Sequence, residues 1–574
     1  MPSSIPRRRL LSIAAQTAAA IAASQFFVIE SGAQSKTRKY AAAFRPLDDF
    51  IEQYMRGMNS PGMTFVTASR EGIERVATYG FSDLRGTAHI DAAELFQIGS
   101  ITKSIVANCL LQLRQEGKLD LHKPVREYLP WFRVESKFPP ITTHHMLTHT
   151  SGLPDDSPVF LSDPAAQHRA AYAPGQHFHY SNMAFSTLGH LLAALDGRPL
   201  AEVIRKRVFE PLGMTQSEAV ISMDIRDRMA GNYSSYQNDR PYPRFGRLCE
   251  GPGIIISDAD GCIASTPRDM GLYIQMIANH GKGPRSVLLS DESFALFSKP
   301  YIPAEEFGPT ASYGYGIAVD TFDGHQILRH TGGMVSFASA IQIDIDQGVG
   351  AFASINAMQG YRPTPVVQFA VDLMRAQEER KHRPPMPPVI PATRVENAGD
   401  YAGVYHGEDG RKLEIDAADR KLFLLHEGAR LPLENSGGDT FLIPHPDFSR
   451  FLLVFGRADT VDVKGAVVDA GWGGDWYTNS KYAGAKKFEY PAEWNGYTGH
   501  YRNESPWIAS MHIVIRKGTL WIDGVIPLEM GTEGDFHLRD EAASPEWIRF
   551  ADRVNGQCMR IKFSGEDLWR VFTP

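Results

Sequence analysis

A single Ser-x-x-Lys motif, Ser100-Ile101-Thr102-Lys103, constrains this 574-residue chain more than any other feature. If the segment opens a helix, Ser and Lys lie on one face, and the first-turn amides point at whatever the Ser hydroxyl attacks. A hydroxyl needs a neighbouring base to attack an acyl carbon at neutral pH, and a partly desolvated Lys can serve. Alone, the motif also fits the capped start of a surface helix, so the motifs that follow it decide between the two interpretations.

Two further motifs follow in the order Tyr180-Ser181-Asn182 and His330-Thr331-Gly332-Gly333. The three together resemble the active-site elements of the penicillin-recognising serine hydrolases: Ser-x-x-Lys, Tyr-x-Asn, and Lys-Thr-Gly or His-x-Gly. Framing segments extend the resemblance over roughly residues 45–375, within the branch that holds class C β-lactamases, family VIII esterases and D-aminopeptidases. These segments are Pro61-Gly62, Leu147-Thr148-His149-Thr150-Ser151-Gly152-Leu153, Pro211-Leu212-Gly213-Met214 and Ser265-Thr266-Pro267-Arg268-Asp269.

The resemblance implies a role for each motif residue. Ser100 is the expected nucleophile, and Lys103 and Tyr180 form a coupled base and acid; which of the two is the base stays open. Asn182 is expected to orient Lys103 and the substrate amide, while the backbone amides of Ser100 and Gly333 form the oxyanion hole and Gly332 lets substrate approach closely. His330 is the remaining catalytic candidate. An imidazole is a weaker, pH-dependent cation than the Lys of many β-lactam-processing relatives, which argues against a dedicated penicillinase.

Neither a metal nor a cofactor is expected. His144, His145 and His149 could be read as zinc ligands, but they fall in the segment that matches the family's structural loop, and no Glu stands at metalloprotease spacing. No Gly-x-Ser-x-Gly motif suggests an α/β-hydrolase, and no Gly-rich loop suggests a phosphate site. The net charge of −7 and the lack of a basic stripe beyond the N-terminus argue against a nucleic-acid partner.

The chain length predicts more than one domain. We expect an α+β β-lactamase/transpeptidase-like domain over residues 40–380, with an antiparallel sheet flanked by helices plus a helical subdomain. A Pro-rich linker over residues 381–395 cannot continue a helix. After it, Tyr401-Ala402-Gly403-Val404-Tyr405 and Tyr497-Thr498-Gly499-His500-Tyr501 begin two similar stretches of alternating runs and turns. These predict two small antiparallel, lipocalin-like β-barrels over residues 396–490 and 491–574, one larger sandwich being the alternative.

Residues 1–33 have the layout of a signal peptide. Arg7, Arg8 and Arg9 precede an Ala-rich apolar stretch, and Ser31-Gly32-Ala33 is a small-residue cleavage candidate. The chain is therefore expected to be exported, periplasmic or secreted, with no stable membrane insertion after cleavage. An uncleaved N-terminal membrane anchor is the alternative.

Three functions fit these residues. The leading hypothesis is a serine peptidase or amidase that hydrolyses short or unusual peptides, including D-residue-containing or linearised cyclic ones, through an acyl-enzyme on Ser100. The second is a carboxylesterase with weak β-lactamase activity, which uses the same residues. The third is a penicillin-binding protein that acylates slowly and senses peptidoglycan. The expected partner is thus a small peptide or ester substrate; substrate identity and oligomeric state stay open.

Overall fold

The computed structural model describes residues 29–30, 39–161, 168–358, 362–458, 464–531, 534–539 and 544–572. The predicted signal segment, residues 1–33, lies outside these residues except for Ile29–Glu30, which forms strand β1. Within the described ranges, no helix is both long and apolar enough to cross a membrane. The four cysteines, Cys109, Cys249, Cys262 and Cys558, are all free thiols.

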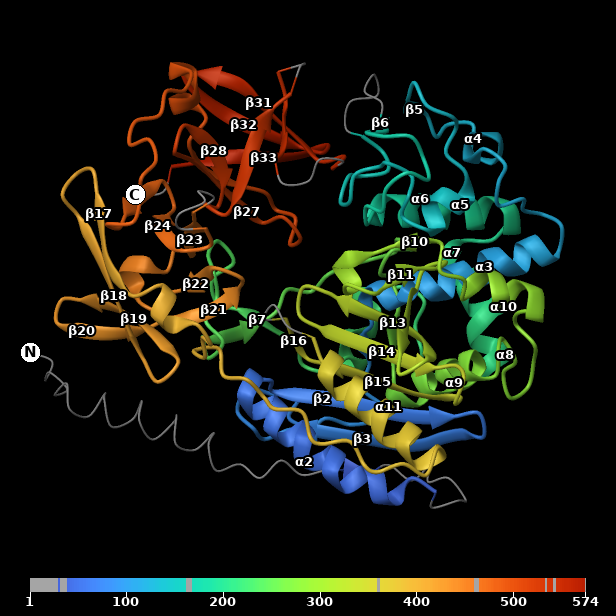
Figure 1. Cartoon of the computed structure of the whole chain (residues 1–574). Helices are drawn as coiled ribbons and strands as arrows, with labels where there is room; N and C mark the ends of the chain where they lie inside the picture. The colour runs from blue at the N-terminus through green and yellow to red at the C-terminus, as the bar shows by residue number, and fades with distance from the viewer. Residues whose placement is uncertain are drawn as a thin grey trace, which may run out of the picture.

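A nine-stranded sheet organises the first part of the chain (Figure 1). Every neighbouring pair of its strands is antiparallel. In spatial order the strands are β1, β3 (Gly72–Gly80), β2 (Gly62–Ser69), β15 (Val349–Ile355), β14 (Ala338–Asp344), β13 (His325–Gly333), β12 (Ala318–Phe322), β11 (Ser312–Tyr313) and β10 (Ile302–Pro303).

Helices cover both faces of this sheet, so its central strands are buried throughout. Successive side chains of a strand point to opposite faces, and β2 accordingly places Met63 and Phe65 in one core and Val66 and Ala68 in the other. The first core lies under α2 (Ala41–Met58) and α11 (Thr364–Glu378), which Figure 1 shows on the outer face. The second core lies under α9 (Pro267–Ala278) and the helical part of the domain.

The helical part is built round α3 (Thr102–Gln115), which is buried along most of its length. The other helices and short elements of the domain complete it or link it to the sheet. They are α4 (Val125–Tyr128), α5 (Thr143–Leu147), α6 (Asn182–Asp196), α7 (Leu200–Ile204), α8 (Glu210–Leu212), α10 (Asp291–Phe297), η1 (Gly99–Ile101), η2 (Arg205–Phe209), η3 (Met223–Arg228), η4 (Glu305–Phe307), β4 (Phe96–Gln97), β5 (Val134–Glu135), β6 (His168–Arg169), β7 (Tyr233–Ser235), β8 (Leu248–Glu250), β9 (Ala264–Ser265) and β16 (Ala357–Met358).

Residues 379–397 contain no helix or strand, and two antiparallel sheets follow. The first has nine strands and is nearly closed, because its two edges, β20 (Ala429–Pro432) and β21 (Glu434–Gly437), are consecutive in the chain. Between these edges lie β19 (Lys421–His426), β18 (Lys412–Ala418), β17 (Gly403–Gly407), β25 (Asp475–Thr478), β24 (Val467–Trp472), β23 (Leu453–Arg457) and β22 (Thr440–Leu442), with η5 (Ala398–Asp400) before the sheet and η6 (Pro446–Phe448) within it.

The second sheet is a closed barrel of eight strands. Its elements are η8 (Ala492–Gly496), β26 (Gly499–Arg502), β27 (Ser510–Arg516), β28 (Thr519–Ile522), β29 (Ile526–Met530), β30 (Phe536–Leu538), β31 (Trp547–Val554), β32 (Gln557–Phe563) and β33 (Glu566–Val571). Each sheet encloses its own apolar core. The predicted α+β fold with two C-terminal antiparallel barrels is therefore confirmed.

The repeated Tyr-x-Gly-x-Tyr motif makes the same contact in both barrels. The hydroxyl of Tyr405 donates to the carbonyl of Tyr401 at 2.7 Å, and the hydroxyl of Tyr501 donates to the carbonyl of Tyr497 at 2.7 Å. In each case a short 3-10 helix precedes the motif and a strand begins at its glycine. The two barrels thus share a structural repeat as well as a sequence repeat.

Candidate active site

Ser100 lies in η1, and Lys103 lies in the first turn of the buried helix α3 that follows it. The Nζ of Lys103 donates to the Oγ of Ser100 at 3.0 Å, so the predicted nucleophile and one of its two candidate bases are in direct contact. The turn that carries Ser100 is tight, and Gly99 adopts the left-handed φ of 54° there. A hydroxyl at the start of a helix is therefore held against an amine one turn further on.

Lys103 is fully buried and donates two further hydrogen bonds. The acceptors are the side-chain oxygen of Asn182 at 2.6 Å and the backbone carbonyl of Asp260 at 2.9 Å. Burial lowers the pKa of Lys103 to about 8, although the nearby carboxylates of Asp260 and Asp155 oppose the change. A sizeable fraction of this amine is consequently neutral near physiological pH, as a general base requires.

Tyr180 stands just before α6, whose first turn is capped by the side chain of Ser181. The Tyr180 ring stacks on His149 with ring centroids 4.2 Å apart, and the Nζ of Lys103 lies 4.9 Å from the Tyr180 ring centre. Burial raises the pKa of Tyr180 well above its usual range, while a hydrogen bond with Ser100 acts in the opposite direction. The phenol therefore keeps its proton beside the nucleophile.

His149 packs against Tyr180 and helps to hold the segment that carries it. Its Nδ1 accepts the backbone N–H of Ser181 at 2.9 Å, and burial lowers the pKa of His149 well below its usual range. The neighbouring histidines have other partners: His145 caps α5 together with Thr142, and His144 contacts the hydroxyl of Tyr315 at 2.9 Å. These three rings therefore serve as structural groups of the predicted loop.

The third motif forms the end of β13, against the turn that carries Ser100. The fit is tight, because a β-carbon on Gly332 would come within 1.9 Å of the Ile98 carbonyl oxygen, and one on Gly99 within 2.9 Å of the Gly333 nitrogen. The backbone of Gly333 and the turn of Ser100 thus lie next to each other, as an oxyanion hole requires.

His330 is buried on the same strand. Its Nε2 hydrogen-bonds to the hydroxyl of Tyr313 at 2.8 Å, and its Nδ1 lies 2.6 Å from the carbonyl of Thr331. Burial lowers the pKa of His330 to about 3, so the ring is neutral at physiological pH. Both ring nitrogens of His330 are therefore engaged within the protein, and the ring places no fixed charge at the cavity wall.

Three acidic residues of the site were not predicted from the sequence. Asp155 accepts the backbone N–H of Asn182 at 2.9 Å, and Asp156 accepts from the Asn182 side-chain amide at 2.8 Å. Burial raises the pKa of Asp155 to about 7 and that of Asp260 to about 6. Asp155-Asp156 follows the Leu147–Leu153 loop motif after a single residue, Pro154, and that position was the one signal that could have indicated these two.

Ser100, Tyr180, Asn182, His330 and Gly333 line one cavity of about 1600 Å³. Its walls come from distant parts of the chain, including residues 155–160, 234–238 and 505–508. The last group belongs to the second barrel. All the predicted catalytic side chains except the buried Lys103 therefore face a single cavity, which is large compared with ordinary ligand pockets.

Arg362, which precedes α11, is a further cavity residue that sequence reasoning missed. Its guanidinium lies over Gly333, since a β-carbon there would come within 2.5 Å of the Arg362 Nη2. The Arg362 Nε is buried, and among the described residues it has no hydrogen-bond partner. Burial lowers the pKa of Arg362, but a guanidinium stays protonated at any physiological pH. A permanent cation in the cavity wall therefore stands beside Gly333.

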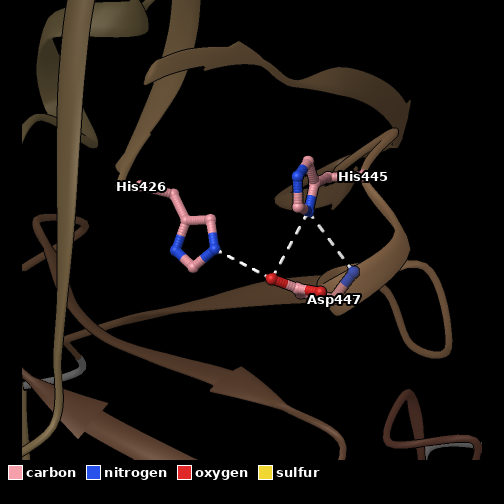
Figure 2. Close-up of side chains that lie close together, drawn as sticks. All are labelled: His426, His445 and Asp447. Atoms are coloured by element: carbon pink, nitrogen blue, oxygen red, sulfur yellow. Dashed lines mark hydrogen bonds and ion pairs between the residues drawn. The ribbon is translucent and has the colours of Figure 1, made fainter. Parts of the chain in front are cut away.

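In the described ranges, two clusters of three His and Asp side chains bring their potential metal-ligand atoms within 4.8 Å of one another. Figure 2 shows His426, His445 and Asp447 on the first barrel, where the Nε2 of His426 lies 3.0 Å from the Asp447 carboxylate and the Asp447 N–H donates to the His445 Nδ1 at 3.3 Å. The second group is His325, Asp344 and Asp346. Neither group lines the cavity at Ser100.

Comparison with known proteins places this site in a family. The beta-lactamase family profile matches residues 47–372, which is more than half of the chain. The chain is 26% identical to a putative penicillin-binding protein PbpX of Bacillus subtilis over 51% of this chain and 71% of that protein. It is 29% identical to the D-alanyl-D-alanine-carboxypeptidase/endopeptidase AmpH of Escherichia coli over 54% of this chain and 83% of that protein. It is 31% identical to the esterase EstB of Burkholderia gladioli over 29% of this chain and 49% of that protein.

Solved structures agree on the fold. An octameric penicillin-binding protein homologue from Pyrococcus abyssi superposes with a TM-score of 0.53 at 22% identity, covering 75% of this chain and 99% of that one. A class C beta-lactamase superposes with a TM-score of 0.50 at 18% identity, covering 60% of this chain and 98% of that one. The three motifs, their contacts and the matched profile together show that this chain belongs to the beta-lactamase family of serine hydrolases.

Proposed function

We propose that the protein is a serine peptidase that cleaves short peptides bearing a free carboxylate close to the scissile amide. The observation that carries the proposal is Arg362, a partly buried guanidinium that lines the cavity with its Nη2 over Gly333. A partly buried cation of this kind gains most from a carboxylate, which a peptide terminus supplies and a simple carboxylic ester lacks.

The reaction follows from the geometry at Ser100. Lys103 takes the Ser100 proton as Oγ attacks the acyl carbon, and the Ser100 and Gly333 amides stabilise the resulting oxyanion. Tyr180, whose phenol keeps its proton, then protonates the leaving nitrogen as the C–N bond breaks, and it recovers a proton from Lys103. Water activated by the same pair hydrolyses the acyl-enzyme. Because an amide nitrogen must be protonated to leave, a high-pKa acid at this position suits peptide cleavage.

The cavity supports a peptide substrate in two further respects. Its volume of about 1600 Å³ exceeds what a small acyl ester would fill. Its wall carries Asp155, Asp156 and Glu306 as well as Arg362, and these charges suit a substrate with both an amine and a carboxylate. Export to the periplasm or the medium, with processing near residue 33, belongs to this proposal and is tested by sequencing the N-terminus of the mature protein.

The carboxylate is tested by replacing Arg362 with Ala. We expect KM for a short D- or L-aminoacyl peptide with a free C-terminus to rise about 10- to 100-fold, the usual effect of losing a charge-assisted hydrogen bond. The same peptide with an amidated C-terminus should be unaffected by the substitution. Arg240→Ala is the matched control, because it removes from the same cavity a cation that already pairs with Asp239 at 2.9 Å.

Turnover of peptides, anilides and esters and labelling by penicillin, each with Ser100→Ala as the blank, distinguish a peptidase from a carboxylesterase and a penicillin-binding protein. Peptide or anilide turnover that is lost in the Ser100 variant supports the peptidase and shows its stereochemical preference. Fast ester turnover without amide cleavage would instead indicate a carboxylesterase. A long-lived acyl-enzyme with labelled penicillin and no turnover would indicate a penicillin-binding protein.

A further inference from the structure

One carboxylate of the second barrel is bound inside the catalytic domain. Glu546 stands just before β31, yet its Oε1 accepts the backbone N–H of Asp155 at 2.6 Å and lies 3.1 Å from the Nε2 of His179. Its other oxygen, Oε2, accepts the hydroxyl of Ser564 from the same barrel. Only 6% of Glu546 is exposed. Figure 1 shows the second barrel, in red, beside the helical part of the catalytic domain, in cyan.

Both partners of Glu546 are next to catalytic groups. Asp155 accepts the backbone N–H of Asn182 through its side chain at 2.9 Å and that of Met183 through its carbonyl at 2.9 Å, so it holds the start of α6. Asn182 in turn accepts from Lys103. His179 directly precedes Tyr180, and its backbone N–H donates to the carbonyl of His149 at 2.8 Å. Glu546 therefore joins the two segments that set Asn182 and Tyr180.

The contact also brings charges together. Asp155 faces the carboxylates of Asp156 and Glu546 and the ammonium of Lys103. Burial is the largest cause of the raised pKa of Asp155, and the charges of Asp156 and Glu546 raise it further. Although burial disfavours an ionised Glu546, hydrogen bonds from His179, Ser564 and Asp155 hold the pKa of Glu546 below its usual value. The glutamate is thus anionic, and its removal would change the charge that Lys103 experiences through Asp155.

We propose that Glu546 is a positioning residue of the Ser100 site, so that the docked second barrel is part of the catalytic machinery. It acts on the reaction by fixing Asp155 and His179, and through them Asn182 and Tyr180. The inference rests on the serine hydrolase chemistry of Ser100 and is independent of the peptide substrate proposed above. A purely structural glutamate would hold the domains together without affecting the reactivity of Ser100.

The test measures Ser100 reactivity with probes too small to reach the barrel. Glu546→Gln, which keeps the side-chain volume, is compared in the full-length protein with Glu529→Gln, an exposed glutamate on β29 of the same barrel. We expect kcat for p-nitrophenyl acetate and the rate of labelling by a small fluorophosphonate to fall about 10- to 100-fold in the Glu546 variant, with KM changed less than about threefold. The Glu529 variant should match the unmodified protein.

The pH profile provides a second measurement. Removing the Glu546 charge lowers the pKa of Asp155, and a more fully ionised Asp155 raises the pKa of Lys103, so the midpoint of the rise in kcat/KM should move to higher pH in Glu546→Gln. Unchanged labelling and an unchanged profile in a folded variant would overturn the proposal. If Glu546→Gln does not fold, Ser564→Ala is used instead; it frees only Oε2 and should give the same changes at smaller size, and normal rates there would refute the inference. If Glu546→Gln lost peptide turnover but was still labelled normally by the small probes, the positioning role of Glu546 would be contradicted. The peptidase proposal would not be affected by that result.

Discussion

Individual side chains at this site owe their chemistry to burial. Lys103 is removed from water, and its ammonium is held by two oxygen acceptors and by Ser100. Desolvation disfavours the charged form of an amine and the ionised form of a phenol, so it makes Lys103 a better base and keeps Tyr180 an acid. His330, buried on the adjacent strand, stays neutral and does not titrate in the working range. One physical cause therefore assigns different roles to three groups.

Lys103 predicts how activity depends on pH. The base must be unprotonated, and burial lowers the pKa of Lys103 to about 8, so kcat/KM for p-nitrophenyl acetate should rise with pH to a midpoint near 8. The midpoint belongs to the coupled groups around Ser100 and not to one residue. Lys103→Arg should lower kcat about 10²- to 10⁴-fold, because a guanidinium cannot accept the proton. A flat profile between pH 6 and 9 would contradict the assignment.

Helix caps and two glycines of positive φ link short sequence patterns to the elements that they begin. Ser181 caps α6 and Thr266 caps α9, and these caps fix where Tyr180 and the apolar helix after Pro267 stand. In the barrels, the repeated motif places a glycine of positive φ at the start of a strand, with Gly403 at 148° and Gly499 at 153°. Residues with a β-carbon rarely adopt that backbone conformation.

The two glycines predict different costs for the same substitution. Gly403→Ala introduces backbone strain alone, because a β-carbon there meets nothing within 4 Å. Gly499→Ala adds a steric clash, since its β-carbon would lie 2.3 Å from the Nη1 of Arg570. We expect the free energy of unfolding to fall by about 1–3 kcal/mol in Gly403→Ala and by more in Gly499→Ala. Scanning calorimetry measures both as a decrease in Tm. Gly399→Ala, without a positive φ and without a neighbour, is the control; equal losses at all three positions would contradict this account.

At the scale of the whole molecule, polar contacts tie the two barrels to the catalytic domain and to each other. The Arg244 N–H donates to Glu434 of the first barrel at 2.8 Å, and Arg502 of the second barrel donates to Asn238 at 3.0 Å. Between the barrels, Arg516 donates to the Gly473 carbonyl at 3.0 Å, and Lys517 pairs with Asp469 at 2.8 Å. Few of these groups are fully exposed, so the arrangement of domains depends on specific partners.

Arg516 is the buried member of the contact between barrels, with 5% of the residue exposed. Arg516→Ala should leave the Gly473 carbonyl buried without this donor and lower the unfolding free energy of the barrels by about 1–3 kcal/mol. Calorimetry should show the barrel transition at lower temperature while turnover of p-nitrophenyl acetate stays normal. The exposed Arg549→Ala on β31 is the matched control and should leave the transition unchanged. Reduced turnover of p-nitrophenyl acetate in Arg516→Ala, together with the lower transition temperature, would contradict the prediction that this contact stabilises the barrels without affecting activity.

The residues around Ser100 show how far sequence reasoning reaches. Ser100, Lys103, Tyr180 and Asn182 could be predicted because each stands in a short motif whose spacing has a local consequence, a helix turn or a cap. The structure brings these four together in direct contact. The antiparallel sheet, its helices and the two barrels could likewise be predicted from motif order and from the alternating runs after the Pro-rich segment.

The sequence by itself therefore predicted Ser100 as the candidate nucleophile, Lys103 and Tyr180 as its coupled base and acid, and the fold that holds them. Only the tertiary structure decided the surroundings: Arg362 over Gly333, Asp260 against Lys103, and Glu546 on Asp155 across 391 residues of chain. No local pattern marks these side chains, because an isolated Arg, Asp or Glu in a loop is ordinarily solvated and acquires a role only when distant segments bury it. The charges around Ser100 are thus set by how distant segments and domains pack, whereas the motif residues themselves are marked by local sequence.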